Sequence, residues 1–432
     1  MQHINKYKHL IFSLTLIVGS EFMVSRKKYI VTIIAVVLVT AILTLSLGNM
    51  LMVEAGQKVV LSKETYNQMK NMYEKYAKQE SVMEIAKRDF LYEADEKKML
   101  EGALEGTLKA LGDPYTQFMT KEELDALMQD TEGSYEGIGV YITASDDNKI
   151  LIVSPIEDTP AEKAGLKTGD KIIRINGTEY TAEQIDQAVK IMKGEPGTDV
   201  TLTVQRVKED GTSDISDVVV NREKIKINTI KPAMLEDEIG YIRITTFDMQ
   251  TEEDFKAAYK ELKNQGMKSL VIDLRYNPGG IIESTVGISD MFMGEGIVTY
   301  TKTKAGEVDY FKSDKNAEDI PIVLLVNEGS ASASEIMAGA MKDTQRATLV
   351  GTKTFGKGIV QRVQRFGNEG EGIKMTVSEY FTPNGINIHG IGIEPDMEIT
   401  LSEDAKGYGA EYYDTDNQLQ KAVEILKEKM NQ

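Results

Sequence analysis

Three closely spaced serines follow an apolar, strand-like run and carry the strongest chemical signal in the chain. The run 321–326 leads into a turn of small residues that contains Ser330, Ser332 and Ser334, and a helix-forming stretch comes next. Such a turn places a hydroxyl at the end of a strand and at the positive end of a helix, where backbone N–H groups can stabilise an oxyanion. The same residues would also suit a tight turn with a serine helix cap, so spacing alone leaves both interpretations open.

A lysine in a glycine-rich loop is the second candidate group. Lys357 lies between Gly356 and Gly358, on a backbone that can approach its neighbours closely. A buried lysine loses proton affinity and can act as a neutral base near pH 7. A surface lysine or a phosphate-binding lysine is the alternative. Walker A spacing is missing and no Ser or Thr follows Lys357, so the pattern disfavours nucleotide binding.

Composition limits the chemistry further. The 432 residues include no Cys and three His, and the formal net charge is −18. The absence of Cys excludes a thiol protease, a thiolate zinc site and disulfide bonds in this chain. His3 and His9 precede the first long apolar run, so a Ser-His-Asp triad would have to use His389, which we expect to be a turn or strand residue. The acidic balance gives no electrostatic footprint for nucleic acid.

An uncharged apolar segment near the N-terminus predicts a membrane helix. Residues 29–47 contain no charge, the basic run 26–28 precedes them, and Glu54 follows. The positive-inside rule then predicts a cytoplasmic N-terminus and an extracytoplasmic remainder. A cleaved signal peptide is the alternative, but no small-x-small cleavage site follows. The shorter apolar run 10–18 cannot span alone, and Met23 looks like an ordinary start, so we interpret the first 22 residues as a start-site artefact.

The rest of the chain changes character twice. Residues 57–128 read as helices, with Thr120 as an N-cap, and their apolar stripe indicates either packing on the same domain or a dimer contact. That stripe consists of Tyr66, Met69, Tyr73 and Tyr76. From Ile225 strands and helices alternate, which predicts an α/β domain with a covered sheet. The expected elements are strands 239–244, 269–274 and 320–326, helices 251–264 and 334–342, and a closing helix with the stripe Leu419, Ala422, Val423 and Leu426.

Short β runs between these regions resemble a PDZ domain. The glycine-bearing run of Gly137, Ile138, Gly139 and Val140 opens a strand expected over 137–142. A run Ala-Gly-Leu-x-x-Gly-Asp-x-Ile-x-x-Ile-Asn-Gly follows at 164–177, with an Asn-Gly hairpin turn. The resemblance implies that backbone N–H groups of 137–140 bind a terminal carboxylate while the strand edge pairs with the arriving peptide.

Six ordered motifs resemble the carboxy-terminal processing peptidases, a tail-specific serine protease family, from about residue 88 to 400. They are Leu-Gly-Asp-Pro-Tyr at 111–115, Gly-Tyr-Ile-Arg-Ile at 240–244, Asp-Leu-Arg-Tyr-Asn-Pro-Gly-Gly at 273–280, Gly-Ser-Ala-Ser-Ala-Ser-Glu-Ile at 329–336, Gly-Lys-Gly-x-x-Gln at 356–361 and Tyr-Phe-Thr-Pro-Asn-Gly at 380–385. The resemblance implies a multidomain α/β protein: a membrane helix, a helical segment, a PDZ domain and an α/β serine protease domain.

The resemblance also implies a role for each site residue. Ser332 would be the nucleophile, Lys357 the base and Gln361 the group that positions the lysine. The family's oxyanion donors would be the N–H of Ala333 and that of Gly279 or Gly280. Ser330 and Ser334 are expected to be structural or capping residues, and Lys353 lacks the glycine flanks of Lys357. Arg275 is expected to make structural hydrogen bonds, and no metal or other cofactor is needed for acyl transfer.

The expected domains are a tail and anchor or signal (1–55), a helical region (56–130), a PDZ domain (131–222), the peptidase domain (223–402) and a C-terminal helical segment (403–432). We expect an endopeptidase at the cell membrane whose substrates are proteins with apolar C-termini. A homodimer built by the helices of 57–128 is a further hypothesis. In the family the PDZ domain can also gate the active site. The alternatives are a PDZ scaffold with an inactive protease domain, and a signalling protease that cuts one regulatory protein.

Overall fold

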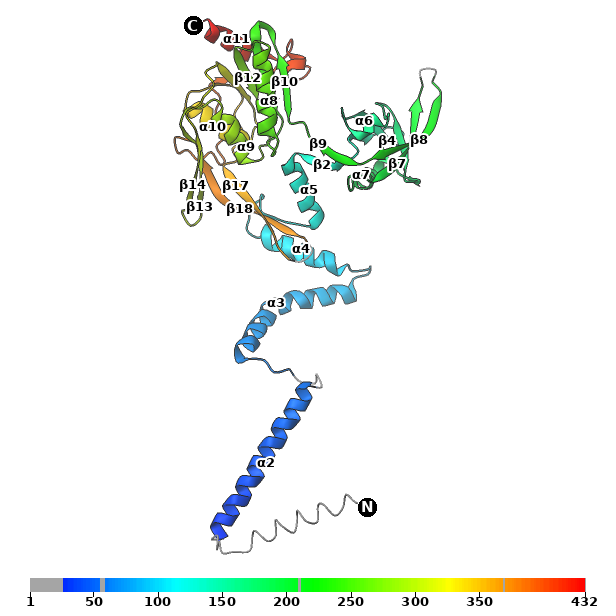
Figure 1. Ribbon diagram of the computed structural model, residues 1–432, viewed down its shortest axis with the longest axis vertical. Helices are drawn as coiled ribbons and strands as arrows, with labels where there is room; N and C mark the ends of the chain where they lie inside the picture. Colours follow the sequence, from blue (N-terminus) through cyan, green and yellow to red (C-terminus); the bar gives the residue numbers. More distant parts are fainter. Residues whose placement is uncertain (1–25, 55–58, 209–210, 368–369, 432) are drawn as a thin grey trace, which may run out of the picture. The chain divides into compact units, whose positions relative to one another are not determined.

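The computed structural model describes residues 26–54, 59–208, 211–367 and 370–431 (Figure 1). The chain divides into two units, Met1–Met99 and Leu100–Gln432. The apolar run 10–18 and the alternative start at Met23 lie outside the described residues.

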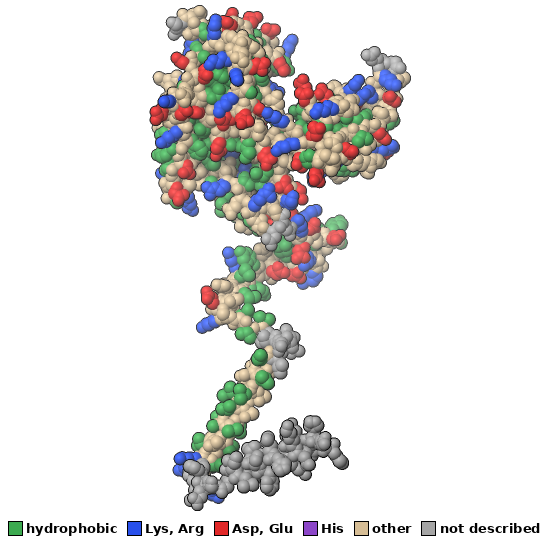
Figure 2. All heavy atoms as spheres, viewed as in Figure 1, with side chains coloured by type: hydrophobic (Ala, Val, Ile, Leu, Met, Phe, Trp, Pro, Cys, Tyr) green, Lys and Arg blue, Asp and Glu red, His purple; other side chains and the backbone are tan. Residues whose placement is uncertain are grey.

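Helices α2 and α3 form most of the described part of the first unit, which ends just inside α4 (Glu96–Lys109). α2 (Arg26–Glu54) contains a 25-residue apolar span with a mean hydropathy of 2.8, long enough to cross a bilayer, although a signal sequence would have the same properties. Hydrophobic side chains run along this helix, with basic residues at its start (Figure 2). α3 (Lys63–Asp89) begins where Ser62 Oγ accepts the N–H of Thr65 at 3.0 Å.

The apolar stripe on α3 is solvent-exposed. Tyr66, Met69, Tyr73 and Tyr76 each expose at least 50% of their surface among the described residues. The structure therefore does not show the stripe packed against the protein's own domain, which was one of its two interpretations.

The PDZ-like segment forms an antiparallel sheet in the order β3-β4-β5-β7-β8, with β6 (Thr178–Glu179) beside β5. Its strands are β3 (Val140–Ala144), β4 (Ile150–Pro155), β5 (Lys171–Ile175), β7 (Asp199–Val207) and β8 (Ser213–Asn221). Helices α6 (Pro160–Lys163) and α7 (Ile185–Met192) help to close an apolar core around Ile150, Ile172 and Leu202. The expected hairpin is present, because Asn176 and Gly177 both have positive φ between paired Ile175 and Thr178.

The prediction of one continuous strand over residues 137–142 is wrong. β2 (Ser134–Gly137) ends and pairs with β9 (Glu223–Lys226), and β3 starts only at Val140. Gly139 takes φ +79 between them and so turns the chain. A Cβ there would lie 2.4 Å from Thr159 Cβ, so the close approach also requires glycine.

A six-stranded sheet in the order β10-β11-β12-β15-β16-β19 is the centre of the larger domain, and all its neighbours pair in parallel except β10 with β11. Its strands are β10 (Ile230–Met234), β11 (Ile239–Ile244), β12 (Ser269–Asp273), β15 (Ile322–Val326), β16 (Thr348–Gly351) and β19 (Met397–Glu398). The order confirms the expected α/β alternation. Both faces are covered, as parallel sheets require.

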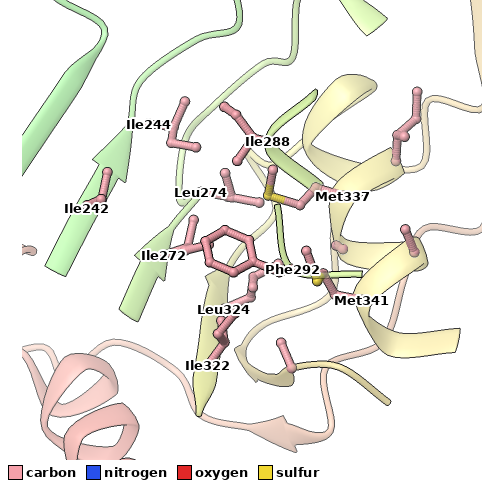
Figure 3. Packing of buried hydrophobic residues seen from close by; sticks show 14 of the residues in the cluster. Ile242, Ile244, Ile272, Leu274, Ile288, Phe292, Ile322, Leu324, Met337 and Met341 are labelled. Atoms are coloured by element: carbon pink, nitrogen blue, oxygen red, sulfur yellow. The ribbon is translucent and has the colours of Figure 1, made fainter. Parts of the chain in front are cut away.

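Alternate strand residues serve the two faces of this sheet. Ile242, Ile272 and Leu324 pack toward helices α8 (Thr251–Asn264), α9 (Ile282–Asp290) and α10 (Ala333–Asp343), and Figure 3 shows them in one apolar cluster with Met337 and Met341 of α10. Tyr241, Val271 and Leu325 face α11 (Asn417–Met430) instead, where the expected stripe of Leu419, Ala422, Val423 and Leu426 is buried.

The prediction that residues 56–130 form a helical region is partly wrong, because one strand of a second sheet lies within them. α4 (Glu96–Lys109) and α5 (Lys121–Glu132) are helical, and Thr120 caps α5 with a capping box as expected. Between them β1 (Gln117–Met119) pairs with β18, which satisfies backbone N–H and C=O groups that an extended segment cannot bond within itself. The sheet also contains β13 (Gly296–Thr303), β14 (Val308–Ser313), β17 (Ile359–Arg365) and β18 (Gly372–Phe381).

Candidate active site

The three serines after β15 differ in burial and bonding. Ser330 and Ser334 are fully buried, and their hydroxyls donate to the carbonyls of Leu274 (2.8 Å) and Asn277 (3.0 Å). Ser332 is only half-buried. Ser330 and Ser334 therefore brace the turn, while the side chain of Ser332 remains accessible.

Ser332 has an unusual backbone conformation at the N-cap of α10. Its φ of 53° and ψ of −113° lie outside the regions that non-glycine residues normally occupy. Such strain costs about 1–3 kcal/mol and persists only where the surrounding structure enforces it. A strained residue between a strand and a helix N-terminus is also the arrangement that exposes the nucleophilic hydroxyl in the α/β-hydrolase fold.

Glu335 joins the serine turn to the lysine loop. Its side chain is fully buried on α10. Oε1 accepts hydrogen bonds from Thr354 Oγ1 (2.6 Å) and Gly356 N (2.7 Å), and Oε2 accepts from Ser332 N (2.9 Å) and Lys357 N (2.8 Å). One carboxylate thus binds the backbone of both candidate dyad residues, so their relative position depends on it.

Lys357 is half-buried beside this carboxylate, with its Nζ 4.7 Å from the ring centroid of Tyr115. Burial lowers the pKa of Lys357 below its ordinary value, and the positive charge of Lys374 lowers it further, while Asp113 and Glu335 oppose the shift. A lowered pKa increases the neutral amine that could accept a proton from a hydroxyl.

No hydrogen bond joins Lys357 Nζ to Ser332 Oγ in the described part of the chain. Gln361, expected to position the lysine, instead donates from Nε2 to Thr376 Oγ1 at 3.2 Å on the neighbouring strand. Lys353, the weaker lysine candidate, is exposed and forms an ion pair with Glu394 at 2.8 Å.

The glycine turn 279–280 lies directly against the serine. Gly279 has φ +102, and a Cβ on it would lie 2.8 Å from Ser332 Cβ and 2.9 Å from Ala333 N. The N–H of Gly279 already donates to Asn277 Oδ1 at 2.8 Å. The N–H groups of Gly280 and Ala333 have no acceptor among the described residues, so of the two glycines Gly280 offers the available donor.

A cleft of about 670 Å³ is lined in part by Tyr115, the residue whose ring Lys357 Nζ contacts. Its walls combine a loop with residues of β17 and β18 and are lined by Leu111, Gly112, Asp113, Pro114, Tyr115, Thr116, Ile359, Met375, Thr376 and His389. His389 is exposed in a turn, as expected. Asp113 organises the loop, because its carboxylate accepts from Tyr115 N (3.0 Å) and Thr116 Oγ1 (2.6 Å).

The predicted peptide-binding loop at 137–140 borders an apolar groove of about 130 Å³ in the PDZ-like segment. The groove lies between β3 and α7 and is lined by Tyr135, Ile138, Gly139, Val140, Ile142, Val189, Met192 and Lys193. Three of the four predicted loop residues line it, whereas Gly137 does not. β3 is an edge strand of its sheet, so one of its sides can accept a further strand.

Residues outside the predicted set also shape the site. The buried salt bridges of Arg275 with Asp273 (2.6 Å) and Asp416 (2.8 Å) fix the start of the 275–280 turn, which confirms a structural role for Arg275. Asn277 and Glu335 lie within motifs that the sequence singled out, but their roles depend on partners distant in the chain.

Comparison with known proteins gives the family. The chain matches peptidase family S41 over residues 238–399, a PDZ domain over 151–206, and the activating protease CtpB N-terminal domain over 38–123. The carboxy-terminal-processing protease of Bartonella bacilliformis is 37% identical over 354 residues, which cover 80% of this chain and 80% of that protein. A Staphylococcus aureus protein named "Probable CtpA-like serine protease" is 35% identical over 378 residues, 87% of this chain and 73% of that one.

Among solved structures, the chain is similar to the photosystem II D1 C-terminal processing protease, with 31% identity and a TM-score of 0.44 over 72% of this chain and 86% of that chain. The relatives similar over most of its length establish that this chain belongs to the carboxy-terminal processing serine proteases of peptidase family S41 and carries a PDZ domain.

Proposed function

We propose that this protein is a membrane-anchored endopeptidase that uses a Ser332–Lys357 dyad to cleave extracytoplasmic proteins whose C-terminal tails its PDZ domain has captured. The observation that carries the proposal is the buried Glu335 carboxylate, which accepts the backbone N–H groups of both Ser332 and Lys357. The same carboxylate therefore holds the backbone of Ser332, whose hydroxyl is accessible, and of Lys357, whose pKa is lowered.

The chemistry is acyl transfer in two halves. Neutral Lys357 Nζ takes the proton from Ser332 Oγ as the oxygen attacks the scissile carbonyl. The N–H groups of Ala333 and Gly280 bind the resulting oxyanion. Protonated Lys357 then gives its proton to the leaving amine, the C–N bond breaks, and an ester on Ser332 remains. Water hydrolyses this ester with Lys357 again as the base, which releases the acid and regenerates Ser332.

The first proton transfer requires a side-chain movement of Lys357. Its Nζ contacts the Tyr115 ring here, so it must turn toward Ser332 Oγ before it can accept the proton. Gln361 would contribute by exchanging its bond to Thr376 for one to the lysine. We therefore expect the resting enzyme to have low activity until substrate or a partner favours that rotamer.

Tail capture would use the groove between β3 and α7. A terminal carboxylate would bind at the 137–140 turn, and the peptide backbone would pair with the free edge of β3. Val189 and Met192 on α7 would contact its last side chain, so an apolar final residue is favoured.

The N-terminal helix would be the membrane anchor. Arg26, Lys27 and Lys28 at its start favour a cytoplasmic N-terminus and an extracytoplasmic catalytic unit. The boundaries 1–55, 56–130, 131–222, 223–402 and 403–432 remain our proposal for the division of the chain. Protease added to intact cells should therefore digest the catalytic unit, and its protection until lysis would contradict this orientation.

The test uses the full-length protein in detergent micelles and an unfolded protein that ends in apolar residues. We expect cleavage by the parent in the presence of chelator, and a loss of at least about 10³-fold in kcat for Ser332→Ala and Lys357→Ala. Lys353→Ala is the matched control and should keep parental activity. A serine-reactive fluorophosphonate should label Ser332 in the parent.

Two outcomes would contradict the proposal. Cleavage that survives Ser332→Ala would exclude the dyad. Tail binding without cleavage, and without fluorophosphonate labelling of the parent even while the tail is bound, would favour the scaffold that presents proteins to another enzyme.

A further inference from the structure

The peptide between Gly279 and Gly280 is fixed from its carbonyl side. The carbonyl oxygen of Gly279 accepts hydrogen bonds from Thr246 Oγ1 and from Phe247 N, both at 2.9 Å. In a planar trans peptide the C=O and the N–H point in opposite directions. Whatever holds the Gly279 carbonyl therefore also sets the direction of the Gly280 N–H.

That N–H is the available oxyanion donor of the glycine turn. The Gly279 N–H is already bound to Asn277 Oδ1 at 2.8 Å, whereas no described acceptor takes the Gly280 N–H. Gly280 has φ +141, and a Cβ there would lie only 1.9 Å from Phe247 O. The segment 246–247, which follows β11, and the glycine turn are thus in direct backbone contact.

The two donors to the Gly279 carbonyl differ in kind. Phe247 N belongs to a backbone bridge in which Phe247 O in turn accepts from Ile281 N at 2.8 Å. Thr246 contributes a side-chain hydroxyl and is half-buried just after β11. Thr246 is therefore the donor that a substitution can remove while the backbone bridge stays in place.

We propose that Thr246 is a positioning residue for the oxyanion site, because its hydroxyl fixes the 279–280 peptide and thereby aims the Gly280 N–H at the developing charge. This inference rests on the proposed function of Ser332. The Thr246 hydroxyl bonds to Gly279 O and has no hydrogen bond to Ser332 among the described residues, so we argue that it acts through Gly279 and Gly280.

The expected effect is smaller than the loss of an oxyanion donor, which costs about 10²–10³ in kcat. Removing the Thr246 hydroxyl leaves the Gly280 N–H present and the Phe247 bond intact, but it loosens the peptide's orientation. We expect Thr246→Val to lower kcat about tenfold. KM should stay within about twofold, because the oxyanion forms only after the substrate has bound.

The experiment uses the full-length protein in detergent with a peptide substrate and a peptide aldehyde. The aldehyde forms a hemiacetal with Ser332 whose oxygen takes the oxyanion position, so Thr246→Val should weaken aldehyde binding by about the same factor as kcat. Thr246→Ser keeps the hydroxyl and should restore both quantities to within about twofold. Thr245→Val is the matched control, since the hydroxyl of Thr245 reaches Thr229 O at 3.3 Å and not Gly279.

Three results would overturn the inference. The first is a kcat for Thr246→Val within twofold of that of the parent. The second is an equal loss of kcat in Thr245→Val. The third is a loss of kcat in Thr246→Val that leaves aldehyde binding unchanged and that Thr246→Ser does not restore. Parental activity that survives Ser332→Ala would overturn the proposed function instead, and this inference with it.

Discussion

Lys357 should control how activity depends on pH. Its pKa is lowered by burial and by the positive charge of Lys374. Because the proposed base is the neutral amine of Lys357, kcat/KM should rise with pH as Lys357 loses its proton. Lys374→Met removes a charge that disfavours protonated Lys357, so it should raise this pKa and move the rise to higher pH. Activity near neutral pH should then fall several-fold.

A pH–rate profile of the parent and the variant checks this prediction. Lys353→Met is the control, because Lys353 is exposed and paired with Glu394 and should not shift the profile. A rise that moves to lower pH in Lys374→Met would show that Lys374 does not act on the base through its charge.

Glu335 is the residue on which the site geometry most depends. Glu335→Gln retains one acceptor oxygen but brings an NH₂ group against at least one backbone N–H donor in either orientation of the amide, so at least one of the four hydrogen bonds is lost. We expect a loss of about 2 kcal/mol or more in the free energy of unfolding and a large fall in kcat. Glu328→Gln in the same turn is the control, because Glu328 is exposed and interacts with the side chains of Thr352 and Tyr276 rather than with the backbone of Ser332 or Lys357. Equal melting temperatures and equal kcat for the two variants would contradict the prediction.

At the scale of elements, a buried ionic network attaches α11 to the central sheet. Arg275 binds Asp273 at the end of β12 and Asp416, the N-cap of α11, and all three are at most 1% exposed. Arg275→Met leaves two buried carboxylates without a cation, which should cost about 3–5 kcal/mol in urea unfolding followed by circular dichroism. Lys427→Met on the same helix breaks only an exposed pair with Asp237 and should leave the midpoint unchanged. A midpoint for Arg275→Met equal to that of the control would contradict this role of the network.

The elements that the sequence predicted well are those defined by local pattern. The helix expected over 251–264 and the strand over 239–244 have the predicted bounds, because each carries a complete amphipathic or apolar pattern. β1 was missed inside a helical region because its pairing partner, Lys374 opposite Gln117, is more than 250 residues away. Helix α9 and the strands β13 and β14 also lacked a distinctive local pattern.

The same division applies to the site. The serine turn and the glycine-flanked lysine could be recognised as motifs in the sequence. The sequence could not indicate that Gly280 rather than Gly279 has a free N–H among the described residues, or that the Glu335 carboxylate binds the backbone of both Ser332 and Lys357. Both depend on tertiary contacts: Asn277 Oδ1 occupies the Gly279 N–H, and the loop 354–357 folds onto α10. Thr246 had no signal in the sequence, since its partner Gly279 meets it only through the sheet topology.

At the scale of the whole molecule, the exposed stripe on α3 favours a homodimer. Tyr73 is 72% exposed, and with Tyr66, Met69 and Tyr76 it forms an apolar face that nothing covers among the described residues. The proposed membrane anchor would bring a second copy with the same face to high local concentration, and self-complementary faces form closed dimers.

Tyr73→Glu should therefore convert dimers to monomers without loss of folding, because the side chain is already in solvent. Asn71→Glu is the matched control: it adds the same charge to the same helix, but its position faces away from the stripe by helical periodicity. Size-exclusion chromatography with light scattering, on the full-length protein in detergent, should give a dimer for the parent and for Asn71→Glu and a monomer for Tyr73→Glu. A monomeric parent, or a dimer that both variants retain, would show that this face does not join two copies.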